Sequence, residues 1–115
     1  MTGISNASPA TTTNINANTI NTFSSSSTTA TVVGITTSAS SNIFSNVINA
    51  LSCVGTTSGV TNGIMVTGGT TVNVYKNKIY DLSTTGAFTT APGVNGIVLS
   101  GTATPIATGG GTAGS

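Results

Sequence analysis

Residues 73–82 of this chain read N-V-Y-K-N-K-I-Y-D-L, and two earlier stretches repeat their pattern. Residues 14–23 read N-I-N-A-N-T-I-N-T-F, and residues 42–51 read N-I-F-S-N-V-I-N-A-L. All three stretches have asparagine at the first and fifth places and an apolar residue at the second, seventh and tenth. The first asparagines are 28 and 31 residues apart, so the chain repeats with a period near 30.

A Gly-Ile pair marks the same period between these stretches. The pairs begin at Gly3, Gly34, Gly63 and Gly96, in steps of 31, 29 and 33 residues. Asn62 and Asn95 precede the last two of these glycines. A fixed period of 20–50 residues is typical of proteins built from stacked structural repeats.

Each unit is predicted to consist of short strands. Thr, Ser, Asn and Gly are poor helix formers, and residues 14–23 have no apolar stripe at helical spacing. In the first unit one strand surrounds Ile15 and ends at Asn18, and a second begins at Ile20. The Gly-Ile segment, as in residues 96–101, gives a third strand bounded by glycines. Three short strands per unit, joined by turns, predict an all-β fold, a parallel β-helix of about three to four coils.

Stacking the units gives each repeat position a role. Neighbouring strands of a sheet lie ~4.8 Å apart, so equivalent residues should form columns along the stack. A column at a bend is expected from the repeated asparagine, which tolerates left-handed backbone and whose amide can bond to adjacent layers. The glycines are expected at bends that a Cβ would obstruct. The interior columns are expected to be Ile15-Ile43-Val74, Ile20-Ile48-Ile79, Phe23-Leu51-Leu82 and Ile35-Ile64-Ile97, and the bend column Asn18-Asn46-Asn77.

The composition excludes several classes of function. Charged residues make up 3% of the chain, against about 25% in typical soluble domains, and the net charge is +1. Nucleic-acid binding is therefore not expected, because no basic patch is available for a phosphate backbone. No apolar run approaches the ~20 residues of a membrane-spanning helix, and residues 1–6 lack the features of a signal peptide.

Cys53 is the only cysteine, so no internal disulfide can form. It is expected to be an inert residue in or beside the loop after Leu51.

A disordered low-complexity segment is the alternative that the composition raises. The chain has 25 Thr, 15 Ser, 15 Gly and 12 Asn residues, and polar tracts of this kind often stay unfolded. The mean hydropathy of +0.32 and the regular placement of Ile, Val and Leu favour a folded β-structure instead.

The pattern N-V-x-x-N-x-I-x-x-L, followed by a loop and then N-G-I-x-x-S-G, resembles the right-handed parallel β-helix repeats of the pectin-lyase-like superfamily. The resemblance covers the chain from about Gly3 to Ile106. The Thr/Ser/Asn-rich, charge-poor composition is similar to that of adhesin-like repeats in large secreted or cell-surface proteins of bacteria. The resemblance implies the fold but not one activity, because the same repeat carries polysaccharide lyases, hydrolases, adhesins and phage tailspikes.

Residues 73–82 also contain all the charged side chains and both tyrosines of the chain. Lys76, Lys78 and Asp81 fall between the repeat positions, so they are expected to point outward as solubilising residues. The alternative is a carbohydrate-binding face, because an aromatic ring beside a lysine can stack on a sugar and hold its hydroxyls. The candidate residues for such a face are Tyr75, Lys76, Lys78 and Tyr80.

Catalysis is not predicted from this sequence. Glycoside hydrolysis of the usual kind needs two carboxylates, and Asp81 is the only acidic residue. The superfamily's lyases carry acidic clusters that hold calcium, and this chain departs from that pattern. With no histidine and one cysteine, it has neither a zinc ligand set nor a base for a serine nucleophile. No catalytic residue, metal site or cofactor is therefore expected.

These observations lead to an expectation for the whole chain. Residues 3–106 should form the β-helix repeat segment and residues 107–115 a flexible Gly-rich tail. The expected function is that of a non-catalytic structural or adhesive segment of a larger secreted or cell-surface bacterial protein. Its expected partners are a polysaccharide or cell-surface glycan and the flanking β-helix coils of the parent chain. The alternative is part of a polysaccharide lyase or hydrolase with its catalytic coils outside this segment, and a phage or virus fibre is a third option.

Overall fold

The computed structural model describes residues 1–54, 58–85 and 93–101, and these residues form an all-β structure. The described residues contain no helix long and apolar enough to cross a membrane. The strands are β1 Thr2–Asn6, β2 Thr13–Asn16, β3 Thr19–Ser25, β4 Thr31–Thr37, β5 Ser41–Phe44, β6 Val47–Val54, β7 Val60–Val66, β8 Val72–Tyr75, β9 Lys78–Thr85 and β10 Val94–Leu99.

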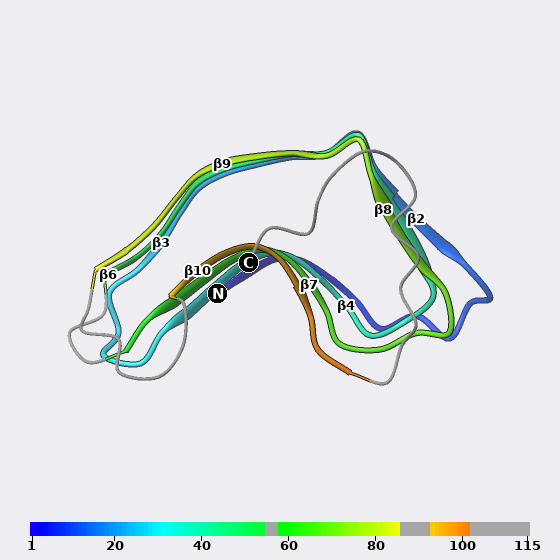
Figure 1. Cartoon of the computed structure of the whole chain (residues 1–115), viewed down its shortest axis with the longest axis horizontal. Helices are drawn as coiled ribbons and strands as arrows, with labels where there is room; N and C mark the ends of the chain where they lie inside the picture. The colour runs from blue at the N-terminus through cyan, green and yellow to red at the C-terminus, as the bar shows by residue number, and fades with distance from the viewer. Residues whose placement is uncertain (55–57, 86–92, 102–115) are drawn as a thin grey trace.

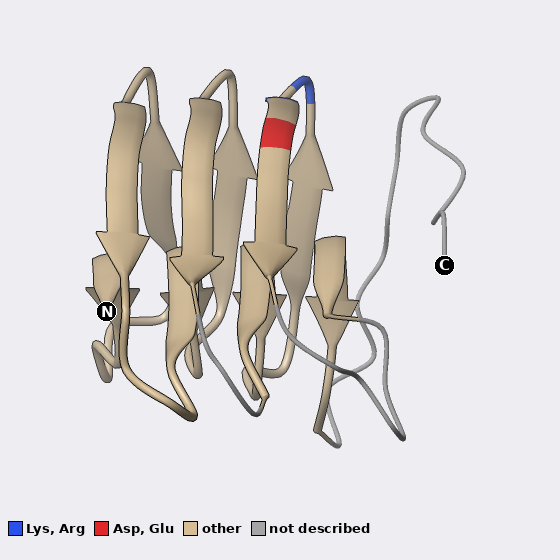
Figure 2. Cartoon of the chain, turned by 90° about the vertical axis from the view of Figure 1, so that its left-hand side faces the viewer, with Lys and Arg blue, Asp and Glu red and all other residues tan. Residues whose placement is uncertain are grey.

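Each strand up to β7 pairs in parallel with the strand three places later in the chain, and this produces three sheets. Their strand orders are β1-β4-β7-β10, β2-β5-β8 and β3-β6-β9, and together they surround a shared interior (Figure 1). We call β1–β3 layer 1, β4–β6 layer 2 and β7–β9 layer 3, with β10 beginning the next layer. The layers lie side by side along the stack (Figure 2). The predicted all-β fold with three parallel strands per repeat is confirmed.

The register of the sheets matches the predicted columns. In the second sheet Ile15 pairs with Ile43, which pairs with Val74. The same holds for the columns that begin at Ile20 and Phe23 in the third sheet and for the column of Ile35 in the first. A slip of one residue would turn every apolar side chain of a strand outward, so the apolar columns specify this register.

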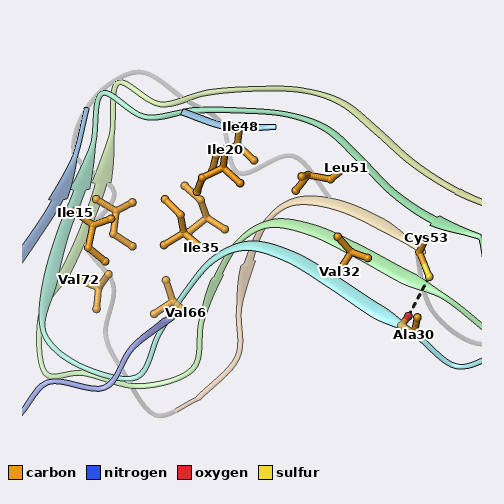
Figure 3. Packing of buried hydrophobic residues seen from close by; sticks show 12 residues of the cluster. Ile15, Ile20, Ala30, Val32, Ile35, Ile48, Leu51, Cys53, Val66 and Val72 are labelled. Atoms are coloured by element: carbon orange, nitrogen blue, oxygen red, sulfur yellow. Dashed lines mark hydrogen bonds between the residues drawn. The ribbon is translucent and has the colours of Figure 1, made fainter. Parts of the chain in front are cut away.

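The apolar columns fill the space between the three sheets (Figure 3). Burial is greatest in layer 2, which has a layer on either side. The side chains of Ile35, Ile43, Ile48 and Leu51 are all 0% exposed. Their layer 3 counterparts in the second and third sheets, Val74, Ile79 and Leu82, are only partly buried.

The repeated glycines, which we call the glycine column, lie inside the strands of the first sheet. This corrects the expectation that glycines mark the ends of these strands. The column consists of Gly3, Gly34, Gly63 and Gly96. Gly34 is the fourth of the seven residues of β4, and the first sheet bows toward the third about half-way along its strands (Figure 1). A Cβ on Gly34 would lie 2.6 Å from the carbonyl oxygen of Gly63 and 2.7 Å from Cγ2 of Ile48. The obstruction that the sequence predicts is therefore real, and it comes from the next layer's backbone and from the opposite sheet.

Cys53 is the last residue but one of β6, so it lies beside the end of the strand, and the strand extends past Leu51, after which the sequence predicts a loop. Its side chain is 0% exposed, and its thiol donates a hydrogen bond of 3.2 Å to the carbonyl oxygen of Ala30 (Figure 3). Inward-facing places of a strand continue past Leu51, and Cys53 occupies the next of them. The predicted Gly-rich tail, residues 107–115, lies outside the described residues.

Candidate functional site

The candidate residues surround the bend between β8 and β9 in layer 3. Figure 2 shows the lysines at this bend and Asp81 a little further along β9. Val74, Ile79 and Leu82 face the core. Ile79 and Leu82 both point inward although they are three residues apart, because the positive φ of Asp81 interrupts the alternation of side chains along β9. Lys76, Lys78 and Asp81 are exposed, as the repeat pattern predicts.

The residue before each repeated asparagine makes the bend, which corrects the prediction that the asparagine adopts the left-handed backbone. Ala17, Ser45 and Lys76 have φ values of 56°, 54° and 55°, whereas no repeated asparagine has a positive φ. A second column of positive φ follows, with Thr22 at 58°, Ala50 at 52° and Asp81 at 55°. The outward positions of Lys76 and Asp81 are therefore set by backbone geometry that every layer repeats.

The repeated asparagines form an amide ladder, which we define as Asn18, Asn46 and Asn77. Oδ1 of Asn46 accepts from the backbone N–H of Asn18 at 3.1 Å and from its Nδ2 at 3.0 Å. Oδ1 of Asn77 accepts from Asn46 in the same way, at 3.0 and 2.9 Å. Nδ2 of Asn46 also donates to the carbonyl oxygen of Ile15, and Nδ2 of Asn77 to that of Ile43. These residues join the layers at the bend, so they serve the stack and leave no amide group for a ligand at Asn46.

Tyr75 is stacked on a residue that the sequence reading did not single out. Its ring lies 5.0 Å from that of Phe44, centroid to centroid, with 3° between the planes. Phe44 is its register partner on β5. This contact covers one face of the Tyr75 ring, so that face is not available to stack on a sugar.

Tyr80 and Lys78 form a separate pair on β9. Nζ of Lys78 lies 4.9 Å from the centroid of the Tyr80 ring, a distance at which a cation is attracted to the ring face. Tyr80 is 44% exposed. Of the four candidate residues the structure thus brings Lys78 and Tyr80 together, while Tyr75 contacts Phe44 and Lys76 occupies the tip of the bend.

The described residues hold no group of three His, Cys, Asp or Glu side chains that could bind a metal ion. The Cys53 thiol is buried and bonded to a backbone carbonyl, whereas Asp81 is exposed on β9. The exposed face of β9 has an aromatic ring, an ammonium group, the carboxylate of Asp81 and hydroxyls.

Two polar clusters were missed by the sequence reading. Asn62 is 4% exposed, and its Oδ1 accepts a 2.9 Å hydrogen bond from Nδ2 of Asn95 in the next layer. The hydroxyls of Thr37 and Ser41 are buried and lie 2.9 Å apart. The Asn-Gly repeat was the available signal for the first cluster, whereas the second had none, because layer 3 has valines at its positions.

A third polar feature follows the outer face of the second sheet. Nδ2 of Asn42 donates to Oδ1 of Asn14 at 2.9 Å, and Nδ2 of Asn73 donates to Oδ1 of Asn42 at 2.8 Å. We call these three residues the outer ladder. The first asparagine of each repeated stretch therefore also links the layers.

Comparison with known proteins finds no relative of this chain. No protein-family model matches the sequence, and no match is found among curated proteins or among solved structures.

Proposed function

We propose that the chain is a segment of a right-handed parallel β-helix of the pectin-lyase-like kind. We further propose that it serves as a non-catalytic structural or adhesive part of a larger secreted or cell-surface bacterial protein. The fold assignment is supported by the pairing of each strand with the strand three places later in three parallel sheets. The amide ladder between layers supports it as well.

One observation carries the structural role: the repeated residues of the chain are used to join its layers. The apolar columns form the core, the glycines allow close approach of the layers, and the asparagines bond from layer to layer. The single cysteine and the single acidic residue of the chain lie on different sides of the sheet. Cys53 is buried in β6, while Asp81 lies on the surface of β9.

The adhesive part of the proposal rests on the exposed face of β9. Tyr80 is 44% exposed, and the ammonium group of Lys78 lies over one face of its ring. A neutral polysaccharide would therefore stack on the opposite face of Tyr80, and Lys78 would donate hydrogen bonds to its hydroxyls. The chain has a net charge of +1, so an affinity for glycans would depend on these contacts and not on long-range attraction.

A polysaccharide panel tests the proposal, with binding and bond cleavage scored separately for the full chain. Binding that is lost in Tyr80→Ala and kept in Tyr80→Phe would support the adhesive role, because the phenylalanine retains the ring. A chain that binds no glycan would be structural only, and the adhesive role would then be withdrawn. Cleavage of any glycan would overturn the non-catalytic assignment and favour a carbohydrate-active enzyme.

A further inference from the structure

Three asparagines of the described residues have side chains that form no hydrogen bond within the described chain. The other asparagine side chains there are all bonded, including those of the amide ladder and the outer ladder. Each of the three follows a core isoleucine directly along its strand, so its amide faces outward. The three residues are Asn16, Asn21 and Asn49.

Two of these unbonded amides share a column with Tyr80 on the outer face of the third sheet. Asn21 on β3 pairs with Asn49 on β6, and Asn49 pairs with Tyr80 on β9. We call these three residues the tyrosine column. Asn21 is exposed, Asn49 is partly buried and Tyr80 is 44% exposed. The column therefore combines an aromatic ring in layer 3 with accessible amides in layers 1 and 2 that do not join the layers.

We propose that the tyrosine column binds a linear, neutral polysaccharide of extended β-linked sugars that runs along the axis of the stack. The proposal rests on the glycan-binding role proposed for Lys78 and Tyr80, and it adds Asn49 and Asn21 as ligand contacts. One sugar ring stacks on Tyr80, and the next two rings lie over the two asparagines. Each amide has two N–H donors and an acceptor oxygen, so it can hydrogen-bond to adjacent hydroxyls of one sugar.

The spacing of the column favours this direction of the ligand. Strands β3, β6 and β9 lie side by side (Figure 2), and neighbouring strands of a sheet are ~4.8 Å apart. One ring lengthens an extended β-linked chain by roughly the same distance. A chain that crosses the strands therefore meets one residue of the column with each sugar, whereas a chain along β9 would meet Lys78 and Asp81 instead.

The charges around the column favour a neutral ligand. Lys78 and Asp81 lie on either side of Tyr80 along β9, and both are exposed. Their charges are opposite, so an anionic polysaccharide would gain little net attraction from the pair. Strands β3 and β6 contain no charged residue. Recognition in layers 1 and 2 therefore depends on hydrogen bonds from the amides.

Isothermal titration calorimetry of the full chain tests this proposal, with oligomers of β-1,4-linked glucose and of β-1,4-linked mannose from the disaccharide to the hexasaccharide. Affinity should rise from the disaccharide to the trisaccharide, which spans the column. Asn49→Ala should weaken the binding of every oligomer about two- to tenfold, the usual effect of losing a hydrogen bond. Asn21→Ala should weaken the trisaccharide and longer oligomers by a similar factor and leave the disaccharide unchanged.

Asn16→Ala is the matched control, because Asn16 has an unbonded amide on another sheet, in the column where Tyr75 stacks on Phe44. This variant should bind as the wild type does. All three asparagine variants should keep the melting temperature of the wild type, since none of them loses a hydrogen bond within the described chain.

Binding that Tyr80→Ala abolishes but Asn49→Ala and Asn21→Ala leave unchanged would overturn the axial placement and retain the glycan-binding role. An effect of Asn21→Ala that is the same at every length, or an Asn16→Ala variant as weak as Asn49→Ala, would also overturn it. So would binding of another glycan of the panel with no binding of either oligomer series. A chain that binds no glycan would overturn both this placement and the adhesive role.

Discussion

Asn46 has the largest share of the hydrogen bonds at the bends, with four made by its side chain to layers 1 and 3. The residue is 1% exposed, so water cannot replace these bonds. We expect Asn46→Ala to lower the free energy of unfolding by about 1–3 kcal/mol, because it leaves buried polar groups without partners. Urea denaturation of the variant and the wild type measures this difference.

Asn42→Ala is the matched control, because Asn42 belongs to the outer ladder and is only partly buried. Water can take over its amide bonds, so its loss should change the free energy of unfolding by about 0.5 kcal/mol or less. Equal destabilisation by Asn46→Ala and Asn42→Ala would contradict this expectation, because burial would then not determine how much each ladder contributes to stability.

Lys76 has a backbone conformation that costs a residue with a Cβ about 1–2 kcal/mol. Glycine pays no such steric cost, although it loses more entropy on folding, so Lys76→Gly should stabilise the chain by about 0.5–1 kcal/mol. Lys76→Ala should leave stability nearly unchanged, because alanine already occupies this position in layer 1 as Ala17. Thermal unfolding of the two variants and the wild type measures these changes in stability. A Lys76→Gly variant less stable than Lys76→Ala would show that strain is not relieved there.

At this scale the sequence predicts a residue's role where the same residue type recurs in each layer. The asparagines of the amide ladder recur, so their place at the bend and their bonds between layers could be inferred. Ala17, Ser45 and Lys76 differ in side-chain chemistry, yet all three have a positive φ. The left-handed backbone therefore belongs to the position in the repeat and not to one type of side chain. No pattern in the sequence could have identified them as the bending residues.

The glycine column determines how closely the first sheet approaches the third. We expect Gly34→Ala to destabilise the fold by about 1–3 kcal/mol, the usual cost of forcing extra volume into a packed interior. The methyl group would meet the Gly63 carbonyl oxygen, which is backbone and cannot rotate away. Chemical denaturation measures the loss. Gly96→Ala serves as its control, because a Cβ at Gly96 would meet none of the described residues within 4 Å. Wild-type stability in Gly34→Ala would show that the sheets can separate at little cost.

The hydroxyls of Thr37 and Ser41 form a buried pair at the turn between β4 and β5. Oγ of Ser41 donates to the carbonyl oxygen of Ala39, and Nδ2 of Asn6 donates to both hydroxyl oxygens. Valines fill the same two places in layer 3, so an apolar version of this turn exists in the chain. We expect Thr37→Val and Ser41→Val to couple, with the double variant about 0.5–3 kcal/mol more stable than the sum of the single effects predicts. A double-mutant cycle that gives additive effects would contradict this expectation.

Strand pairing was predictable because parallel strands with a constant period align equivalent residues. Ile43 could be matched to Ile15 and Val74 from spacing alone. Contacts on the outer face were less predictable, because the residues there change from layer to layer. Phe44 and Tyr75 stack because the register pairs them, whereas the equivalent residue in layer 1 is Asn16. The sequence therefore did not indicate that Tyr75 stacks on Phe44 or that Lys78 lies over the ring of Tyr80.

In the described part of the chain, the molecule is a stack of layers whose main contacts are with their neighbours along the axis. Its charged residues are 3% of the chain, so ion pairs contribute little to its stability. Stability must come from burial of the apolar columns and from hydrogen bonds between layers. In such an arrangement the free energy is approximately a sum of contributions from layers and from the interfaces between them.

This organisation predicts that the stack unfolds from its ends. Layer 2 is covered on both sides, and its core side chains are fully buried, whereas Ile97 and Leu99 beyond layer 3 are well exposed. Opening of an outer layer breaks one interface, but opening of layer 2 breaks two, so its amides should open with the largest free energy. Hydrogen exchange resolved by residue should therefore show the slowest exchange in β4, β5 and β6 and faster exchange in β1 and β10. Equal protection in all layers would mean that the stack unfolds as one cooperative unit, and the interfaces would then be too strongly coupled for the layers to open separately.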